Sequence, residues 1–146
     1  MIKIGIDPDL DKSGFALTYQ QTSEVTTYTI SELLGRIVEL MEQFPNIPVQ
    51  VYIEFGELNK SNFHIGKIPA GIRDIKAYCA QIGANTGKNF AAAKLILDLI
   101  SSMGINCIKV RPTNRKIDAA TFKKLSGITK RTNQEMRDAY LLIVGR

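Results

Sequence analysis

Four acidic residues in three separate parts of the chain have the types and spacing to hold a divalent cation. Asp7 and Glu54 each end a short apolar stretch, and Glu135 and Asp138 lie close together near the C-terminus. Two carboxylates brought together repel, and one of them takes up a proton unless a cation holds both. Mg²⁺ prefers oxygen ligands and keeps water molecules for a phosphate substrate. These residue types therefore indicate metal-assisted chemistry on a phosphate group.

The first two acids are positioned by predicted strands. Residues 2–7 and 49–54 alternate apolar with polar or small side chains, which is typical of a strand with one apolar face. A helix predicted over 31–44 connects them, so the two strands should run parallel. Parallel strands end at the same edge of a sheet, where ligands of α/β proteins bind. We therefore expect the two acids side by side, each on the face opposite its strand's apolar residues.

The remaining elements complete an α/β fold. An antiparallel hairpin is predicted over 14–19 and 25–30, and Ser31 is the expected N-cap of the helix after it. The pattern then weakens, with only a hint of a helix at 72–82. Further along, we expect a helix over 91–103, a strand over 105–110, a short helix over 118–125 and a last helix from Asn133. The prediction is one domain (1–146) with a five-stranded mixed sheet, an antiparallel hairpin plus parallel strands, flanked by helices.

The last predicted helix carries the other two acids. Thr132 and Glu135 fit the S/T-x-x-E capping box, which would explain Glu135 without any metal. Asp138 lies one turn further on, beside the apolar stripe of the helix. Its alternative interpretation is a helix-surface carboxylate paired with a nearby base. Two interpretations thus stay open for each of these acids.

Positive charge is concentrated in residues 109–137. The whole chain carries 19 bases, 14 acids and a net charge of +5, and this stretch holds nine of the bases but two of the acids. A basic surface suits a polyanion, because each phosphate that it neutralises releases condensed counterions. The alternative is a solvated face without a partner. The nine bases are Lys109, Arg111, Arg115, Lys116, Lys123, Lys124, Lys130, Arg131 and Arg137.

The composition and the cysteines exclude other classes of protein. With 45% hydrophobic and 23% charged residues, the chain is typical of a globular protein and not of a disordered tail, a collagen-like repeat or a membrane span. We expect no targeting signal. Cys79 and Cys107 have neither zinc-site spacing nor a disulfide framework, so we expect a cytoplasmic location. His64 stands alone in the weakly patterned segment. It is predicted to be a surface or packing residue, or a catalytic one, because histidine titrates near neutrality.

Two matches to known loops fail. The run of acids at Asp7, Asp9 and Asp11 imitates the start of an EF-hand loop. That loop needs Gly at its sixth position and Glu at its twelfth, where this chain has Lys12 and Thr18. An actin-like or sugar-kinase ATPase would need two such domains and a second phosphate loop, for which the chain is too short. Neither a calcium site nor an ATPase is therefore expected.

Three segments together resemble a known family. The segments IGIDPDLDKSGFAL, VYIEFGELN and NQEMRDAYLL are similar to those of RuvC-type Holliday-junction resolvases, most closely the short bacteriophage forms, within the RNase H-like superfamily. The resemblance spans nearly the whole chain in the right order. It implies an RNase H-like fold and a homodimer in a bacterial or phage-infected cell. It also implies an endonuclease that uses Mg²⁺ or Mn²⁺, with two ions per site, to nick four-way DNA symmetrically.

The resemblance also assigns roles to residues. By position, Asp7, Glu54 and Asp138 are the metal-binding catalytic acids, and Glu135 matches a site that is Asp or His in relatives. Relatives carry an aromatic wedge shortly after the strand-end glutamate, for which Phe55 and Phe63 are the candidates; either is otherwise core. The bases of 109–131 correspond to the DNA-contacting region, with these three favoured: Lys116, Lys123 and Lys124.

Two rival functions remain open from the sequence. One is an RNase H-like nuclease that acts on RNA or an RNA–DNA hybrid. The other is a non-catalytic module that binds branched DNA. The presence of all three acids argues against a non-catalytic binding module. A comparison of cleaved substrates would distinguish a junction nuclease from a nuclease that acts on RNA or a hybrid.

Overall fold

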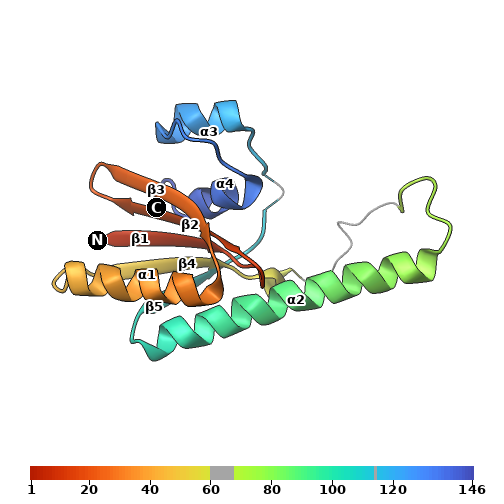
Figure 1. The fold of residues 1–146 in the computed structure, drawn as a ribbon, viewed down its shortest axis with the longest axis horizontal. Helices are drawn as coiled ribbons and strands as arrows, with labels where there is room; N and C mark the ends of the chain where they lie inside the picture. The colour runs from red at the N-terminus through yellow and green to blue at the C-terminus, as the bar shows by residue number, and fades with distance from the viewer. Residues whose placement is uncertain (60–67, 114) are drawn as a thin grey trace.

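A computed structural model describes residues 1–59, 68–113 and 115–146, and in these residues five strands form one mixed sheet with helices on both faces (Figure 1). The strand order is β3-β2-β1-β4-β5. In chain order the elements are β1 (Ile2–Asp7), β2 (Ser13–Tyr19), β3 (Thr22–Tyr28), α1 (Ile30–Gln43), β4 (Val49–Glu54), the 3₁₀ turn η1 (Gly56–Leu58), α2 (Ile75–Ser102), β5 (Asn106–Val110), α3 (Ala119–Ser126) and α4 (Gln134–Leu141). The predicted five-stranded α/β sheet is confirmed.

The strand directions place three carboxyl ends at one edge of the sheet. β1 is antiparallel to β2 but parallel to β4, and β4 is parallel to β5. The chain passes from β3 to β4 through α1, as a crossover between parallel strands requires. The ends of β1, β4 and β5 therefore lie together, as the sequence predicted for β1 and β4.

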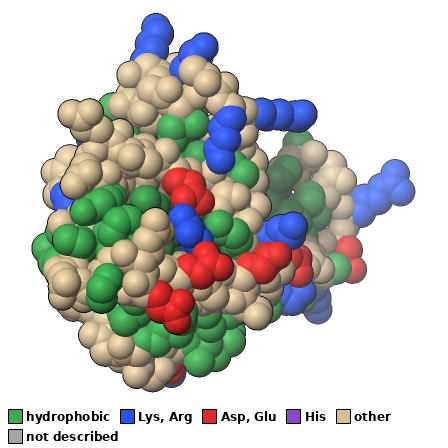
Figure 2. Space-filling view, turned by 60° about the vertical axis from the view of Figure 1, so that its left-hand side comes forward, with side chains coloured by type: hydrophobic (Ala, Val, Ile, Leu, Met, Phe, Trp, Pro, Cys, Tyr) green, Lys and Arg blue, Asp and Glu red, His purple; other side chains and the backbone are tan. Residues whose placement is uncertain are grey.

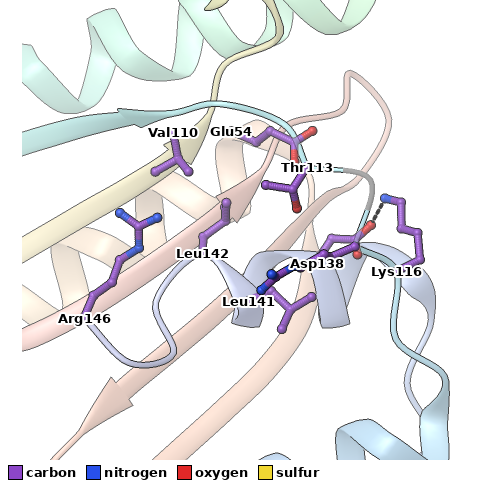
Figure 3. A pocket seen from close by; sticks show the side chains of 9 residues that line it. Glu54, Val110, Thr113, Lys116, Asp138, Leu141, Leu142 and Arg146 are labelled. Atoms are coloured by element: carbon purple, nitrogen blue, oxygen red, sulfur yellow. Dashed lines mark hydrogen bonds and ion pairs between the residues drawn. The ribbon is translucent and has the colours of Figure 1, made fainter. Parts of the chain in front are cut away.

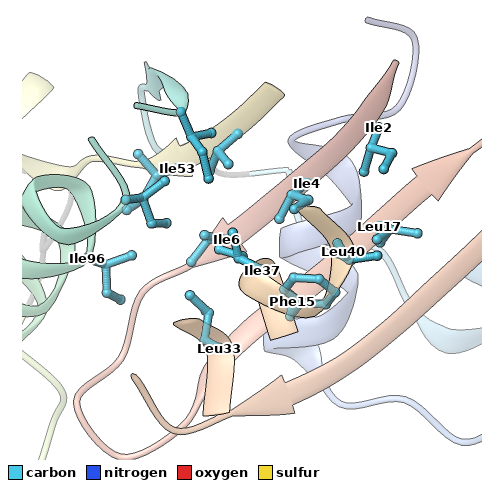
Figure 4. Close-up of a cluster of buried hydrophobic side chains, with 13 residues drawn as sticks. Ile2, Ile4, Ile6, Phe15, Leu17, Leu33, Ile37, Leu40, Ile53 and Ile96 are labelled. Atoms are coloured by element: carbon cyan, nitrogen blue, oxygen red, sulfur yellow. The ribbon is translucent and has the colours of Figure 1, made fainter. Parts of the chain in front are cut away.

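The main core lies on the sheet face that α1 and α2 cover (Figure 4). Alternation along β1 and β4 sends their isoleucines and valines to this face. The buried residues of this cluster are Ile2, Ile4, Ile6, Phe15, Leu17, Leu33, Ile37, Leu40, Val51, Ile53, Ile96, Ile100 and Ile105. The other face is left for the acids at the strand ends and for α4.

Two glycines let α4 approach the second face of the sheet closely. A Cβ added at Gly5 would lie 2.0 Å from the carbonyl oxygen of Ala139, and one at Gly14 would lie 2.2 Å from that of Glu135. Any larger residue would have to push the helix backbone away. These contacts fix α4 over β1 and β2, and so fix the height of its side chains above the sheet edge.

The structure corrects the predicted start of α1 and the hairpin. The N-cap is Thr29 and not Ser31, because Thr29 forms a reciprocal capping box with Glu32. The second hairpin strand begins at Thr22, earlier than predicted, because the turn needs only two residues. Gln20 adopts a left-handed conformation, with φ of 53°, to make that turn.

The segment predicted as a weak helix and a later long one is a single helix, α2. Its buried residues are Ala92, Ala93, Ile96 and Ile100, all in its second half. The first half projects beyond the sheet (Figure 1), so its sequence needs no apolar stripe and the pattern was weak there. None of the helices in the described residues is long and apolar enough to cross a membrane.

Candidate active site

Asp7 and Glu54 are neighbours because their strands are parallel neighbours. β1 and β4 pair with Ile6 opposite Ile53, so the following residue of each strand is an acid at the same edge. The pKa of Asp7 is raised from 3.8 to about 7, first by burial and then by the charges of Glu54 and Asp138. Burial also raises the pKa of Glu54. The sheet edge is therefore a place where negative charge is crowded and partly desolvated.

The third acid, Asp138, reaches this edge from α4. Its side chain is buried, with 7% exposed, and both of its oxygens are engaged. Gln134 donates from Nε2 to Oδ1 at 2.7 Å, and the ammonium of Lys116 pairs with Oδ2. The surface carboxylate envisaged as an alternative is thus half correct, since Asp138 is paired with a base but is not on the surface. A buried polar group needs such hydrogen-bond partners.

Lys116, which was predicted to contact DNA, lies beside the acids, and its side chain is 59% exposed. Figure 3 shows its side chain reaching over to Asp138, and both residues line a pocket with Glu54. Burial lowers the pKa of Lys116, but its hydrogen bond to Asp138 and the charges of Asp138, Asp7 and Glu54 outweigh this effect and raise it. Lys116 is therefore a positive charge that offsets the negative charge of the acids.

The carboxylates of Asp7, Glu54 and Asp138 suit a hard divalent cation, although they are not grouped around one common position for an ion. Carboxylate oxygens are the ligands that Mg²⁺ prefers. The raised pKa of Asp7 means that its ionised form is disfavoured, and a nearby cation would favour it. Within the described ranges, no group of three or more His, Cys, Asp or Glu is arranged to hold an ion. Lys116 takes one oxygen of Asp138, so a shared ion would require that pair to open.

Glu135 is exposed in the first turn of α4, and the predicted capping box there is wrong. The N-cap is Asn133, which accepts from the backbone N–H of Met136 at 2.9 Å. Thr132 instead accepts two hydrogen bonds from Arg137, through its carbonyl and its hydroxyl. Glu135 is the last and smallest of the charges that raise the pKa of Asp7. It lies near the acids without a capping role.

Gln134 and Arg137 belong to the site and were missed as such by sequence reasoning. Gln134 holds Asp138, and Arg137 donates to Gln134 Oε1 at 2.9 Å. The four-residue spacing of Gln134 and Asp138 on a helix was a usable signal, because side chains at that spacing meet. Arg137 stands out in the sequence only as part of the basic stretch, and nothing local to it predicts its partners.

The two candidate aromatic wedges have different outcomes. Phe55 is buried, with 5% exposed, and Lys109 lies over its ring at 4.6 Å. In this structure Phe55 is therefore a core residue, which is the alternative that the sequence left open for it. Phe63 and His64 lie outside the described residues.

Like Lys116, the other predicted DNA-binding bases are exposed. Basic side chains gather over α3 at the top of the view in Figure 2, while acidic ones cluster on the face below. The exposed bases are Lys109, Arg111, Arg115, Lys123, Lys124, Lys130 and Arg131. Arg146, which sequence reasoning missed, lines the pocket of Glu54 and Asp138 and lies 5.5 Å from the Tyr52 ring. Positive side chains therefore border the acid cluster.

The fold of this chain is similar to that of solved RuvC structures. The structure titled "T. thermophilus RuvC in complex with Holliday junction substrate" matches with a TM-score of 0.56 and 13% identity, over 97% of this chain and 89% of that one. A second RuvC structure from Thermus thermophilus matches with a TM-score of 0.49 and 13% identity, over 97% and 90%. No family model matches, and no curated protein matches by sequence. The chain therefore has the RuvC-type, RNase H-like fold that its three motifs predicted.

Proposed function

We propose that this chain is a divalent-metal-dependent endonuclease that cleaves four-way DNA junctions by symmetric nicking. The observation that carries the proposal is the meeting of Asp7, Glu54 and Asp138, from β1, β4 and α4, in one cluster where burial, and then the charges of Glu54 and Asp138, raise the pKa of Asp7 to about 7. The neighbour of the same fold was solved with a Holliday-junction substrate. Acids that repel one another in this way favour a cation, and a cation favours a phosphate.

In the proposed mechanism, Asp7, Glu54 and Asp138 would hold two Mg²⁺ or Mn²⁺ ions, and Glu135 would be a further ligand. When bound, such ions activate water and stabilise the leaving 3′ oxygen of a phosphodiester. The carboxylates would orient the site, and the burial of Asp138 limits screening by bulk water there. Lys116, released from Asp138, would stay close enough to neutralise charge on the phosphate. No covalent protein–DNA intermediate is required.

The bases of 109–131 would hold the arms of the junction. They are exposed, and they begin at the end of β5, the strand beside β4, which carries Glu54. Residues 1–146 would act as one nuclease domain. A four-way junction presents two equivalent strands, and a homodimer with a two-fold axis would present two equivalent sites to them. Such an enzyme would work in the cytoplasm of a bacterial or phage-infected cell.

Cleavage of structured DNA tests this function. Wild type, Asp7→Asn and the matched control Asp98→Asn, which changes an exposed aspartate on α2, are incubated with labelled four-way junction and Mg²⁺. We expect paired nicks from wild type and from the control. Asp7→Asn should bind the junction without nicking it. Normal nicking by Asp7→Asn would overturn the assignment.

The same assay separates the rival functions. Flap DNA, linear duplex and RNA–DNA hybrid are compared with the junction at equal concentration. Preferential cleavage of the hybrid would favour an RNase H-like activity on RNA. Junction binding without cleavage at any Mg²⁺ or Mn²⁺ concentration would favour a binding module.

A further inference from the structure

Among the residues that the structure describes, Arg137 donates hydrogen bonds to uncharged groups only. Its Nε donates to the carbonyl of Ile117 at 3.0 Å, and its Nη1 donates to Thr132 at 2.9 Å (carbonyl) and 3.2 Å (hydroxyl). Its Nη2 donates to Gln134 Oε1 at 2.9 Å. An arginine that only balanced charge would pair with a carboxylate. The rigid fork of donors instead ties three segments to one point.

Those three segments are the ones that frame Asp138. Ile117 directly follows Lys116, which pairs with the Asp138 carboxylate. Thr132 lies just before α4, and Gln134 is the first residue of α4. Arg137 itself directly precedes Asp138. The Arg137 guanidinium therefore holds the loop between β5 and α3 in a fixed position relative to the start of α4. Both segments lie next to Asp138.

The Gln134 amide, held by Arg137, in turn orients the Asp138 carboxylate. An amide side chain has one accepting and one donating end. Arg137 occupies the accepting end, so the donating end of Gln134 is directed at Asp138 Oδ1, 2.7 Å away. Lys116 holds the other oxygen, Oδ2. If a cation displaces Lys116, Gln134 still holds the carboxylate in one orientation.

We propose that Arg137 and Gln134 are positioning residues for Asp138: the arginine fork orients the Gln134 amide, and the amide holds the carboxylate ready for a divalent ion. This inference rests on the proposed function. Groups that orient a metal ligand by hydrogen bonds typically contribute about 10–100-fold to metal affinity or activity. The two residues form one chain of hydrogen bonds, so removing either link should have the effect of removing both.

Mn²⁺ binding without DNA tests the proposal, by calorimetry and electron paramagnetic resonance on the full chain. Arg137→Lys keeps the charge but loses the fork, and Gln134→Met keeps the length but loses the amide. We expect each to weaken Mn²⁺ binding about 10–100-fold, and the double variant to be no weaker than Gln134→Met. In an Asp138→Asn background neither change should matter further. Arg73→Lys and Gln43→Met, at exposed positions remote from α4 in sequence, are the matched controls.

The outcomes separate this inference from the proposed function. Wild type that binds no Mn²⁺ would overturn both. Mn²⁺ binding by wild type with unchanged affinity in Gln134→Met would overturn the positioning role alone. So would additive losses of affinity in the double variant, or an equal loss in the Asp138→Asn background, because then the residues do not act through Asp138. Thermal unfolding in EDTA identifies a variant that fails to fold, and Gln134→Met, which leaves the arginine fork intact, then carries the test.

Discussion

The raised pKa of Asp7 predicts that the metal-free protein loses stability as the pH rises. An acid whose pKa is 3.8 in the unfolded chain and about 7 in the folded one binds more protons when folded. Stability is therefore highest at low pH and falls until the pH passes the folded pKa. Between pH 5 and pH 8 the loss is about 2–3 kcal/mol in all, and it levels off above the folded pKa. Asp7→Asn carries no charge and should remove this part of the profile.

Urea unfolding in EDTA at pH 5, 6, 7 and 8 measures the effect. The free energy of unfolding of wild type minus that of Asp7→Asn should fall by about 2–3 kcal/mol across this range, since the other titrating groups largely cancel. Asp98→Asn should keep the wild-type profile. Saturating Mg²⁺ should flatten the wild-type profile, because a bound cation favours the ionised form. Parallel profiles for wild type and Asp7→Asn would refute the claim that Asp7 lies buried among other acids.

Three further predictions address packing and DNA binding. Gly5→Ala should destabilise the protein by about 1–3 kcal/mol or more in urea unfolding, because its Cβ would meet the Ala139 carbonyl at 2.0 Å; unchanged stability would mean that α4 does not rest on β1. Phe55→Leu should keep junction cleavage at a modest loss of stability, because Phe55 is core; a stable variant without cleavage would restore the wedge role. Lys123→Gln with Lys124→Gln should reduce the slope of log affinity against log salt by about 0.9 for each phosphate that these lysines neutralise in wild type, measured by fluorescence anisotropy on junction DNA, and an unchanged slope would place the DNA elsewhere.

The sequence predicted the sheet and its acids well because the relevant signals are local. Alternation along 2–7 and 49–54 fixes which face each side chain takes, and the helix between them fixes the strand direction. Asp7 and Glu54 could therefore be placed side by side without knowing the packing. The apolar stripe of α4 likewise indicated that Asp138 lies beside a buried surface.

Features that depend on tertiary contacts could not be predicted in this way. The N-cap of α1 is an exception, because the T-x-x-E spacing of Thr29 and Glu32 is a local capping-box signal that the choice of Ser31 overlooked. The pair of Lys116 and Asp138 spans 22 residues and depends on how the loop before α3 folds back. The first half of α2 has no core to face, so its sequence carries no stripe.

Anomalous diffraction can test whether Asp7, Glu54 and Asp138 together bind divalent ions. Crystals are soaked in Mn²⁺ and measured at a wavelength where manganese scatters anomalously. The account predicts anomalous peaks bounded by Asp7, Glu54 and Asp138, with a pair of ions about 3.5–4 Å apart and the Lys116 ammonium moved off Asp138. Ordered crystals at saturating Mn²⁺ with no peak among these acids, and with Lys116 still paired to Asp138, would contradict it.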